Sequence, residues 1–78
     1  MSDVRFYTTA DCRLCDEALD MAMPIITRLR YDLQVIDIID DPEAERLYSE
    51  RIPVIYRLDQ NTALQWPFSA AALYRFLA

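Results

Sequence analysis

Two cysteines three positions apart, Cys12 and Cys15, lie where a strand-forming segment passes into a helical one. Residues 4–8 alternate in polarity and are rich in strand formers. After a short loop at 9–11, residues 12–30 carry apolar side chains at helical spacing. The sequence therefore predicts a strand, a tight loop and a long helix that begins at the first cysteine.

This helix is predicted to have one apolar face and one irregularity. Pro24 lies inside the pattern and lacks an amide hydrogen, so we expect the helix to kink near Asp20. The side chains expected to face the core recur at helical spacing and are Leu14, Ala18, Ala22, Ile25 and Leu29.

A second strand and a short helix come next. Residues 33–39 are apolar on both faces apart from Asp37, a pattern typical of a parallel strand that is covered on both sides. A helix start follows at Asp40-Asp41-Pro42-Glu43, with an aspartate as the cap and proline at the first position. The buried face of this helix is predicted to consist of Ala44, Leu47 and Tyr48.

The remaining residues predict a hairpin and a last helix. Strands at 54–58 and 63–66 flank a turn at 59–62. In this turn Asn61 is the best candidate for a left-handed conformation, because the chain has no glycine. Ser69 is expected to cap the final helix. The inward side chains of that helix are predicted to be Ala72, Leu73, Phe76 and Leu77.

These elements follow one another in the order β-α-β-α-β-β-α. A chain of 78 residues has room for one domain. The first β-α-β unit should be a right-handed parallel crossover, and the hairpin should add antiparallel strands at one edge of the same sheet. We therefore predict a single α/β domain over residues 1–78, with a four-stranded mixed sheet and helices on both faces.

The net charge of the chain bears on which partners it can bind. The chain has eight arginines and thirteen acidic residues, a net charge of −5, and neither lysine nor histidine. An acidic chain is repelled by phosphate backbones and anionic lipids, so we expect no nucleic acid and no membrane as partner. Without histidine, chemistry must rest on thiols, carboxylates, tyrosines or backbone dipoles. No targeting segment is visible, and we expect a cytoplasmic protein.

The cysteine pair has the spacing that disulfide exchange requires. A helix start offers amides without intrahelical partners, and its dipole favours a thiolate at Cys12. Arg13 adds a cation, whereas acidic neighbours on both sides oppose it, so we expect a moderate lowering of the Cys12 pKa. Cys15 should lie about one turn further along the same side of the helix, where it can attack a mixed disulfide.

Two other interpretations of the pair remain open. Both cysteines could be small core-filling residues, because free cysteine is often buried. They could also bind a metal, although zinc prefers four ligands and the chain offers two good ones. A dimer that pooled two pairs would meet that number.

Five stretches of the chain carry a more particular pattern. They are Phe6-Tyr7-Thr8, Cys12-Arg13-Leu14-Cys15-Asp16-Glu17-Ala18, Val35-Ile36-Asp37-Ile38, Arg51-Ile52-Pro53-Val54 and Trp66-Pro67-Phe68-Ser69. With these stretches the chain resembles the small bacterial glutaredoxin-like proteins of the thioredoxin superfamily, and the likeness covers almost its whole length. The resemblance implies a thioredoxin-like fold.

The resemblance also implies roles for individual residues. Cys12 would be the attacking thiol and Cys15 the resolving thiol. Pro53 would be a cis proline facing the dithiol, and Ile52 would offer its backbone to an extended substrate. The alternative for Pro53 is a trans proline that opens an edge strand. The candidate substrate-binding residues are then Arg13, Leu14, Ile52, Pro53 and Trp66.

The chain departs from typical glutaredoxins in two places. Arg13 and Leu14 stand between the cysteines, where those proteins have Pro-Tyr. Before the last helix, Trp66-Pro67-Phe68-Ser69 replaces the glycine pair and acidic residue that hold glutathione. We therefore expect no bound cofactor and weak binding of glutathione, which could still act as external reductant. Trp66 could line the substrate groove or pack at a strand end, and Asp37 could relay protons or be a hydrogen-bonded acid at the strand edge.

Two functions follow from these observations. The favoured one is a thiol–disulfide oxidoreductase, an electron carrier in cell redox homeostasis that acts on disulfides in proteins or small molecules. The other is a binding module that keeps the thioredoxin fold as a docking surface and whose cysteines turn over slowly or not at all. We expect the protein to be a monomer.

Overall fold

The computed structural model describes residues 3–78, and the first two residues of the predicted domain lie outside them. The element order matches the prediction, with one additional 3-10 turn (η1). The elements are β1 (Asp3–Thr8), α1 (Arg13–Arg28), β2 (Asp32–Asp37), η1 (Ile38–Asp40), α2 (Pro42–Tyr48), β3 (Val54–Arg57), β4 (Thr62–Gln65) and α3 (Ala70–Leu77). No helix within residues 3–78 is both long and apolar enough to cross a membrane.

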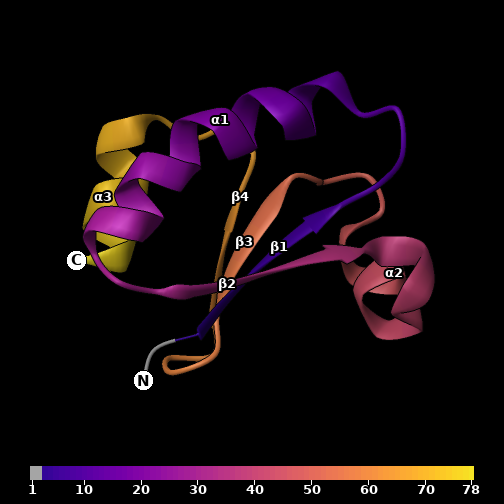
Figure 1. Cartoon of the computed structure of the whole chain (residues 1–78). Helices are drawn as coiled ribbons and strands as arrows, with labels where there is room; N and C mark the ends of the chain where they lie inside the picture. Colours follow the sequence, from indigo (N-terminus) through magenta and orange to yellow (C-terminus); the bar gives the residue numbers. More distant parts are fainter. Residues whose placement is uncertain (1–2) are drawn as a thin grey trace.

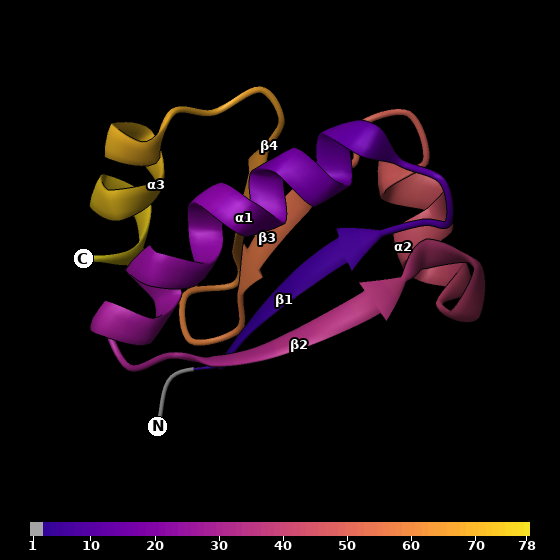
Figure 2. The same ribbon diagram turned by 45° about the horizontal axis from the view of Figure 1, so that its top comes forward.

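The four strands form one mixed sheet in the order β2-β1-β3-β4. β1 and β2 are parallel, and their arrows run side by side in Figure 2. β3 is antiparallel to both β1 and β4, so the predicted hairpin is confirmed. The predicted left-handed residue at its turn is also confirmed, because Asn61 has a φ angle of 53°.

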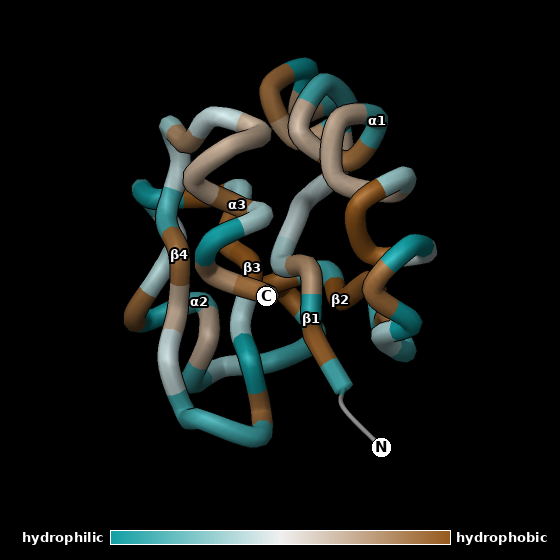
Figure 3. The backbone as a smooth tube through the Cα atoms, turned by 90° about the vertical axis from the view of Figure 1, so that its left-hand side faces the viewer, coloured by the Kyte–Doolittle hydropathy of each residue, from teal (hydrophilic) through white to brown (hydrophobic). Residues whose placement is uncertain are grey.

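Helices cover both faces of the sheet, as predicted. Figure 1 shows α1 and α3 on one side and α2 on the other, near the end of the β2 arrow. The α1/α3 side holds the larger core, in which Phe6, Ile55 and Leu73 are at most 1% exposed. The α2 side holds a smaller cluster built from Tyr7 and three further residues: Ile38, Ala44 and Val54. The apolar segments of β1, β2 and β3 meet at the centre of the molecule in Figure 3.

Helices α2 and α3 have the N-cap residues that the sequence predicted. The carboxylate of Asp41 accepts a hydrogen bond from the Ala44 amide at 3.2 Å. The hydroxyl of Ser69 accepts one from the Ala72 amide at 3.0 Å. Such bonds satisfy amides that have no partner within the helix. α1 runs unbroken past Pro24, which lies on its exposed side.

Three predictions about burial are wrong. β2 was expected to be covered on both sides, but it is an edge strand, and Val35 is 55% exposed. Leu14 is 47% exposed because Cys15 takes the inward position, and consecutive residues point about 100° apart around a helix. Leu47 is 46% exposed because the short α2 helix packs through Ala44 and Tyr48.

Candidate functional site

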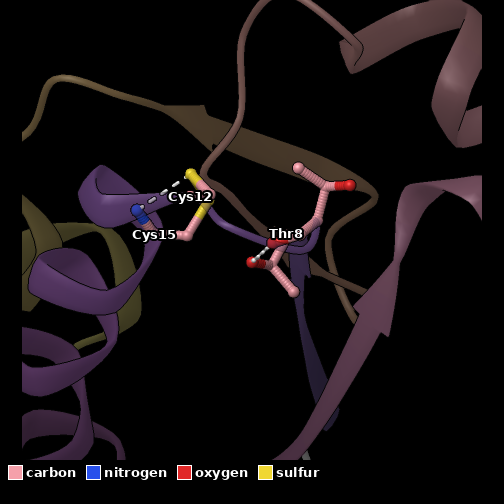
Figure 4. Close-up of a disulfide and its surroundings, with 4 residues drawn as sticks. Thr8, Cys12 and Cys15 are labelled. Atoms are coloured by element: carbon pink, nitrogen blue, oxygen red, sulfur yellow. Dashed lines mark hydrogen bonds between the residues drawn. A yellow bond between two sulfur atoms is a disulfide. The ribbon is translucent and has the colours of Figure 1, made fainter.

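The two cysteines lie at the start of α1, just beyond the end of β1. Asp11 has a φ angle of 58°, and this left-handed turn redirects the chain from the strand into the helix. Cys12 is the N-cap residue, and its Sγ accepts a hydrogen bond from the Cys15 amide at 3.1 Å. Figure 4 shows the two sulfur atoms joined in a disulfide, and the Cα atoms are 5.2 Å apart. A sulfur thus fills the capping position that serine or aspartate usually occupies.

The two sulfur-bearing residues differ in burial. Cys15 is 1% exposed and belongs to the core cluster under α1. Cys12 is partly exposed and rests against the edge of that cluster. A reagent from solution can therefore reach Cys12 while Cys15 is covered. This asymmetry comes from the helix geometry, because the cap residue lies outside the first turn and the third residue of the helix points inward.

The predicted substrate-binding residues gather at the same end of the molecule. Ile52 and Trp66 are partly buried and pack against the cluster that Cys12 also contacts. Pro53 is buried, and its carbonyl oxygen accepts a hydrogen bond from the Trp66 amide at 3.0 Å. The Ile52–Pro53 peptide bond is cis, as the family resemblance implied.

Arg13 and Leu14 lie on the exposed side of the first turn of α1, next to the disulfide. Their side chains add one cation and one apolar group to the surface beside the disulfide. Leu14, which the helical pattern assigned to the core, thus becomes part of the accessible surface around Cys12.

Two features of this region were not predicted from the sequence. The Trp66–Pro67 bond is also cis, and only about 5–6% of such bonds are cis in folded proteins, so nothing in the pattern favoured it. In addition, the exposed Arg51 donates a hydrogen bond to the Gln65 side chain at 3.4 Å and so joins the loop before β3 to the end of β4. The only available signal for that contact was the predicted pairing of the two strands.

Trp66 and Asp37 each contact a residue close by in the chain. The Trp66 ring meets the Phe68 ring edge-on, with centroids 5.1 Å apart, so it packs at the end of β4. The Asp37 carboxylate accepts a hydrogen bond from the Ile39 amide at 3.1 Å and caps η1. Within residues 3–78, no three cysteine or acidic side chains come together in an arrangement that could hold a metal ion.

Comparisons with known proteins agree with this geometry. The family described as the glutaredoxin-like domain (DUF836) matches residues 3–78. A crystal structure of target protein XcR50 from X. campestris is 31% identical, with a TM-score of 0.75 over 95% of this chain and 93% of that one. Protein Ne2328 from Nitrosomonas europaea gives 22% identity and a TM-score of 0.81, covering 99% and 92% of the two chains.

Thioredoxin 1 from Thermosipho africanus TCF52B is 20% identical, with a TM-score of 0.69 over 96% of this chain and 93% of that one. At that identity the likeness concerns the fold alone, and it confirms the thioredoxin-like architecture. Among curated proteins no match was found. The match over nearly the whole length shows that the chain belongs to the glutaredoxin-like (DUF836) family.

Proposed function

We propose that this protein is a thiol–disulfide oxidoreductase in which Cys12 attacks and Cys15 resolves. The observation that carries the proposal is the pairing of one accessible and one buried sulfur at a helix start, close enough to form a disulfide. The amide of Cys15 supports it as well, because a donor aimed at the Cys12 sulfur would stabilise a thiolate there.

The reaction runs through two exchanges of disulfide bonds. In the reduced protein the Cys12 thiolate attacks one sulfur of a substrate disulfide, which forms a mixed disulfide and releases the other substrate sulfur as a thiolate. Cys15 then loses its proton and attacks Cys12 Sγ, which forms the Cys12–Cys15 disulfide and releases the second substrate thiolate. The substrate gains two electrons and two protons in total. An external thiol or dithiol returns both to the protein in the next cycle.

The surroundings of Cys12 bear on the choice of that external thiol. Trp66, Pro67 and Phe68 stand where typical glutaredoxins carry the glycine pair that holds glutathione, and Phe68 is buried. A loop with bulky side chains leaves less room for a tripeptide to approach than a glycine pair does. We therefore propose that a dithiol reduces this protein more readily than glutathione does.

The proposal is tested by the reduction of insulin disulfides with dithiothreitol as the electron source. The wild-type protein should accelerate the reaction, whereas Cys12→Ser should return it to the rate of dithiothreitol alone. Thr27→Ser, an exposed change at the far end of α1, is the matched control and should keep full activity. If the wild-type protein gives no acceleration, the fold serves as a docking surface and the proposed activity is wrong.

A further inference from the structure

A hollow lies on the face of the sheet that α2 covers, between this helix and the strands. Its volume is about 300 Å³, at the lower end of the range for small-molecule sites. It contains neither cysteine, and its lining includes Arg5, Tyr7 and Tyr56 from the sheet together with Asp41, Leu47 and Tyr48 from the α2 region. This cavity is therefore separate from the disulfide site.

Arg5 has an unsatisfied donor in this cavity wall. One terminal nitrogen, Nη1, donates to the Tyr7 hydroxyl at 3.3 Å. The Nε atom is buried and has no hydrogen-bond partner among residues 3–78. Because Nε has almost no accessible surface, a ligand would meet the guanidinium group through its terminal nitrogens, of which Nη2 makes no hydrogen bond among residues 3–78. Planar guanidinium groups pair especially well with carboxylates, because two parallel N–H donors match two oxygens.

Tyrosine rings and aliphatic side chains form the rest of the wall. The Tyr7 and Tyr48 rings lie 5.5 Å apart, and Tyr56 extends the aromatic surface across β3. Burial raises the pKa of Tyr48, so its hydroxyl keeps its proton at neutral pH and can donate a hydrogen bond. Ala44 and Leu47 add apolar surface from α2.

A carboxylate completes the charge pattern. One oxygen of Asp41 accepts the Ala44 amide, which leaves its second oxygen outside that bond. Arg5 and Asp41 form no ion pair within residues 3–78, although the Asp41 charge contributes to raising the Arg5 pKa, after the larger effect of the Tyr7 hydrogen bond. Glu43 is paired with Arg46 at 2.6 Å on the surface of α2. The cavity therefore presents one positive and one negative group that do not neutralise each other directly.

We propose that this cavity binds a small zwitterion, a free α-amino acid with an aromatic or large aliphatic side chain. Its carboxylate would pair with Arg5, its ammonium with Asp41, and its side chain would lie against the tyrosine rings and Leu47. A simple anion would gain Arg5 but meet the charge of Asp41, and a simple cation would gain Asp41 but meet Arg5. Only a ligand with both charges is complementary to both groups.

The first test compares three ligands that differ by one charged group. L-phenylalanine carries both charges, 3-phenylpropionate lacks the ammonium, and phenethylamine lacks the carboxylate. In amide NMR titrations of the full chain, L-phenylalanine should give saturable shifts at Arg5, Leu47 and Tyr48. The other two should bind about tenfold more weakly or worse, the loss expected for one charged hydrogen bond. Absence of saturable shifts, or equal binding of all three ligands, would overturn the proposal.

Variants then separate the two charges. Arg5→Gln should weaken L-phenylalanine binding about tenfold, whereas the matched control Arg75→Gln, an exposed change on α3, should leave it unchanged. Asp41→Asn keeps a good helix cap, so it preserves the fold even if Arg5→Gln does not. It should weaken L-phenylalanine and strengthen 3-phenylpropionate, and no change in their ratio would contradict the assignment. Cys12→Ser should bind as the wild type does, which keeps this test independent of the redox proposal.

Discussion

Arg57 and Arg5 lie on neighbouring antiparallel strands but face opposite sides of the sheet, and their surroundings differ sharply. Arg57 faces α1 and α3. Its side chain makes two hydrogen bonds to Asp59, at 3.0 and 2.7 Å, and one to the Phe76 carbonyl at 2.6 Å. It also lies over the Tyr31 ring, 5.6 Å from the centroid. Arg5 faces α2, has one hydrogen bond to a tyrosine, and keeps a buried donor that has no partner within the described residues 3–78.

The difference between the surroundings of Arg57 and Arg5 indicates that the two faces of the sheet have different roles. On the α1/α3 face two helices close the core, and the buried Arg57 joins β3 to α3 by hydrogen bonding to the Phe76 carbonyl. The Tyr31 hydroxyl donates a further hydrogen bond to α3, at the Leu77 carbonyl. On the α2 face one short helix covers part of the sheet and leaves a cavity with an incompletely satisfied cation. The closed face therefore supports stability and holds the cysteines, whereas the open face has the features of a binding site.

Truncation of core side chains should show the largest contrast between the faces. Phe6→Ala on the closed face should lower the free energy of unfolding by about 3–5 kcal/mol, because Phe6 is 1% exposed and its loss leaves a cavity. Leu47→Ala on the open face should cost about 1 kcal/mol or less, since half of that side chain is already in water. Urea unfolding measures both.

The free energy lost in Phe6→Ala is large enough to unfold so small a domain. Ile55→Val then replaces Phe6→Ala as the closed-face variant, with an expected cost of about 0.5–1.5 kcal/mol. Equal costs for Leu47→Ala and Phe6→Ala would break the comparison, because they would mean that α2 packs as tightly as α1 and α3.

The Arg57–Asp59 contact should give a smaller, pH-dependent contrast. Hydrogen bonds from Arg57 hold the pKa of Asp59 below its ordinary value of 3.8. The contact therefore adds stability above the pKa of the unfolded chain, and this contribution is lost as the pH falls through the lower folded pKa. The stability advantage of the wild type over Asp59→Asn should be constant near neutral pH and disappear on acidification.

Urea unfolding of both proteins across the acid range measures that advantage. Glu43→Gln on α2 is the matched control, because its exposed pair with Arg46 should contribute little at any pH. An advantage that persists at the lowest pH would show that the Arg57–Asp59 contact does not depend on the charge of Asp59.

Much of the fold followed from local patterns in the sequence. The element order, the hairpin with Asn61, and the caps at Asp41 and Ser69 depend on turn and capping chemistry that acts over a few residues. The cis bond at Ile52–Pro53 was predicted from the family resemblance, because a physical argument from sequence alone favours a trans bond.

The errors concern the burial of side chains, which depends on how the helices pack against the sheet. An apolar run such as residues 33–39 looks the same whether its strand is central or at an edge, because coverage depends on which helices lie over the strand and not on the strand itself. Leu14 shows the same limit at the candidate site. Its helical spacing fits the core, but the burial of Cys15 turns it outward.

The cavity beneath α2 could not be anticipated from spacing. Arg5, Tyr48 and Tyr56 lie far apart in the chain and belong to three different elements. Their meeting depends on the pairing of β1 with β3 and on the position of α2. Nothing in the sequence singled out Arg5 from the other seven arginines.

The most direct test of the proposed chemistry is to trap its intermediate. In Cys15→Ser the first attack can proceed, but no second thiol is present to resolve it. The reduced variant, mixed with a small aromatic disulfide, should accumulate a mixed disulfide at Cys12, which mass spectrometry of the intact protein and its peptides would locate. Cys12→Ser should form such an adduct at Cys15 far more slowly, because Cys15 is 1% exposed. Equal rates for the two variants, or no adduct on either, would contradict the assignment of Cys12 as the attacking thiol.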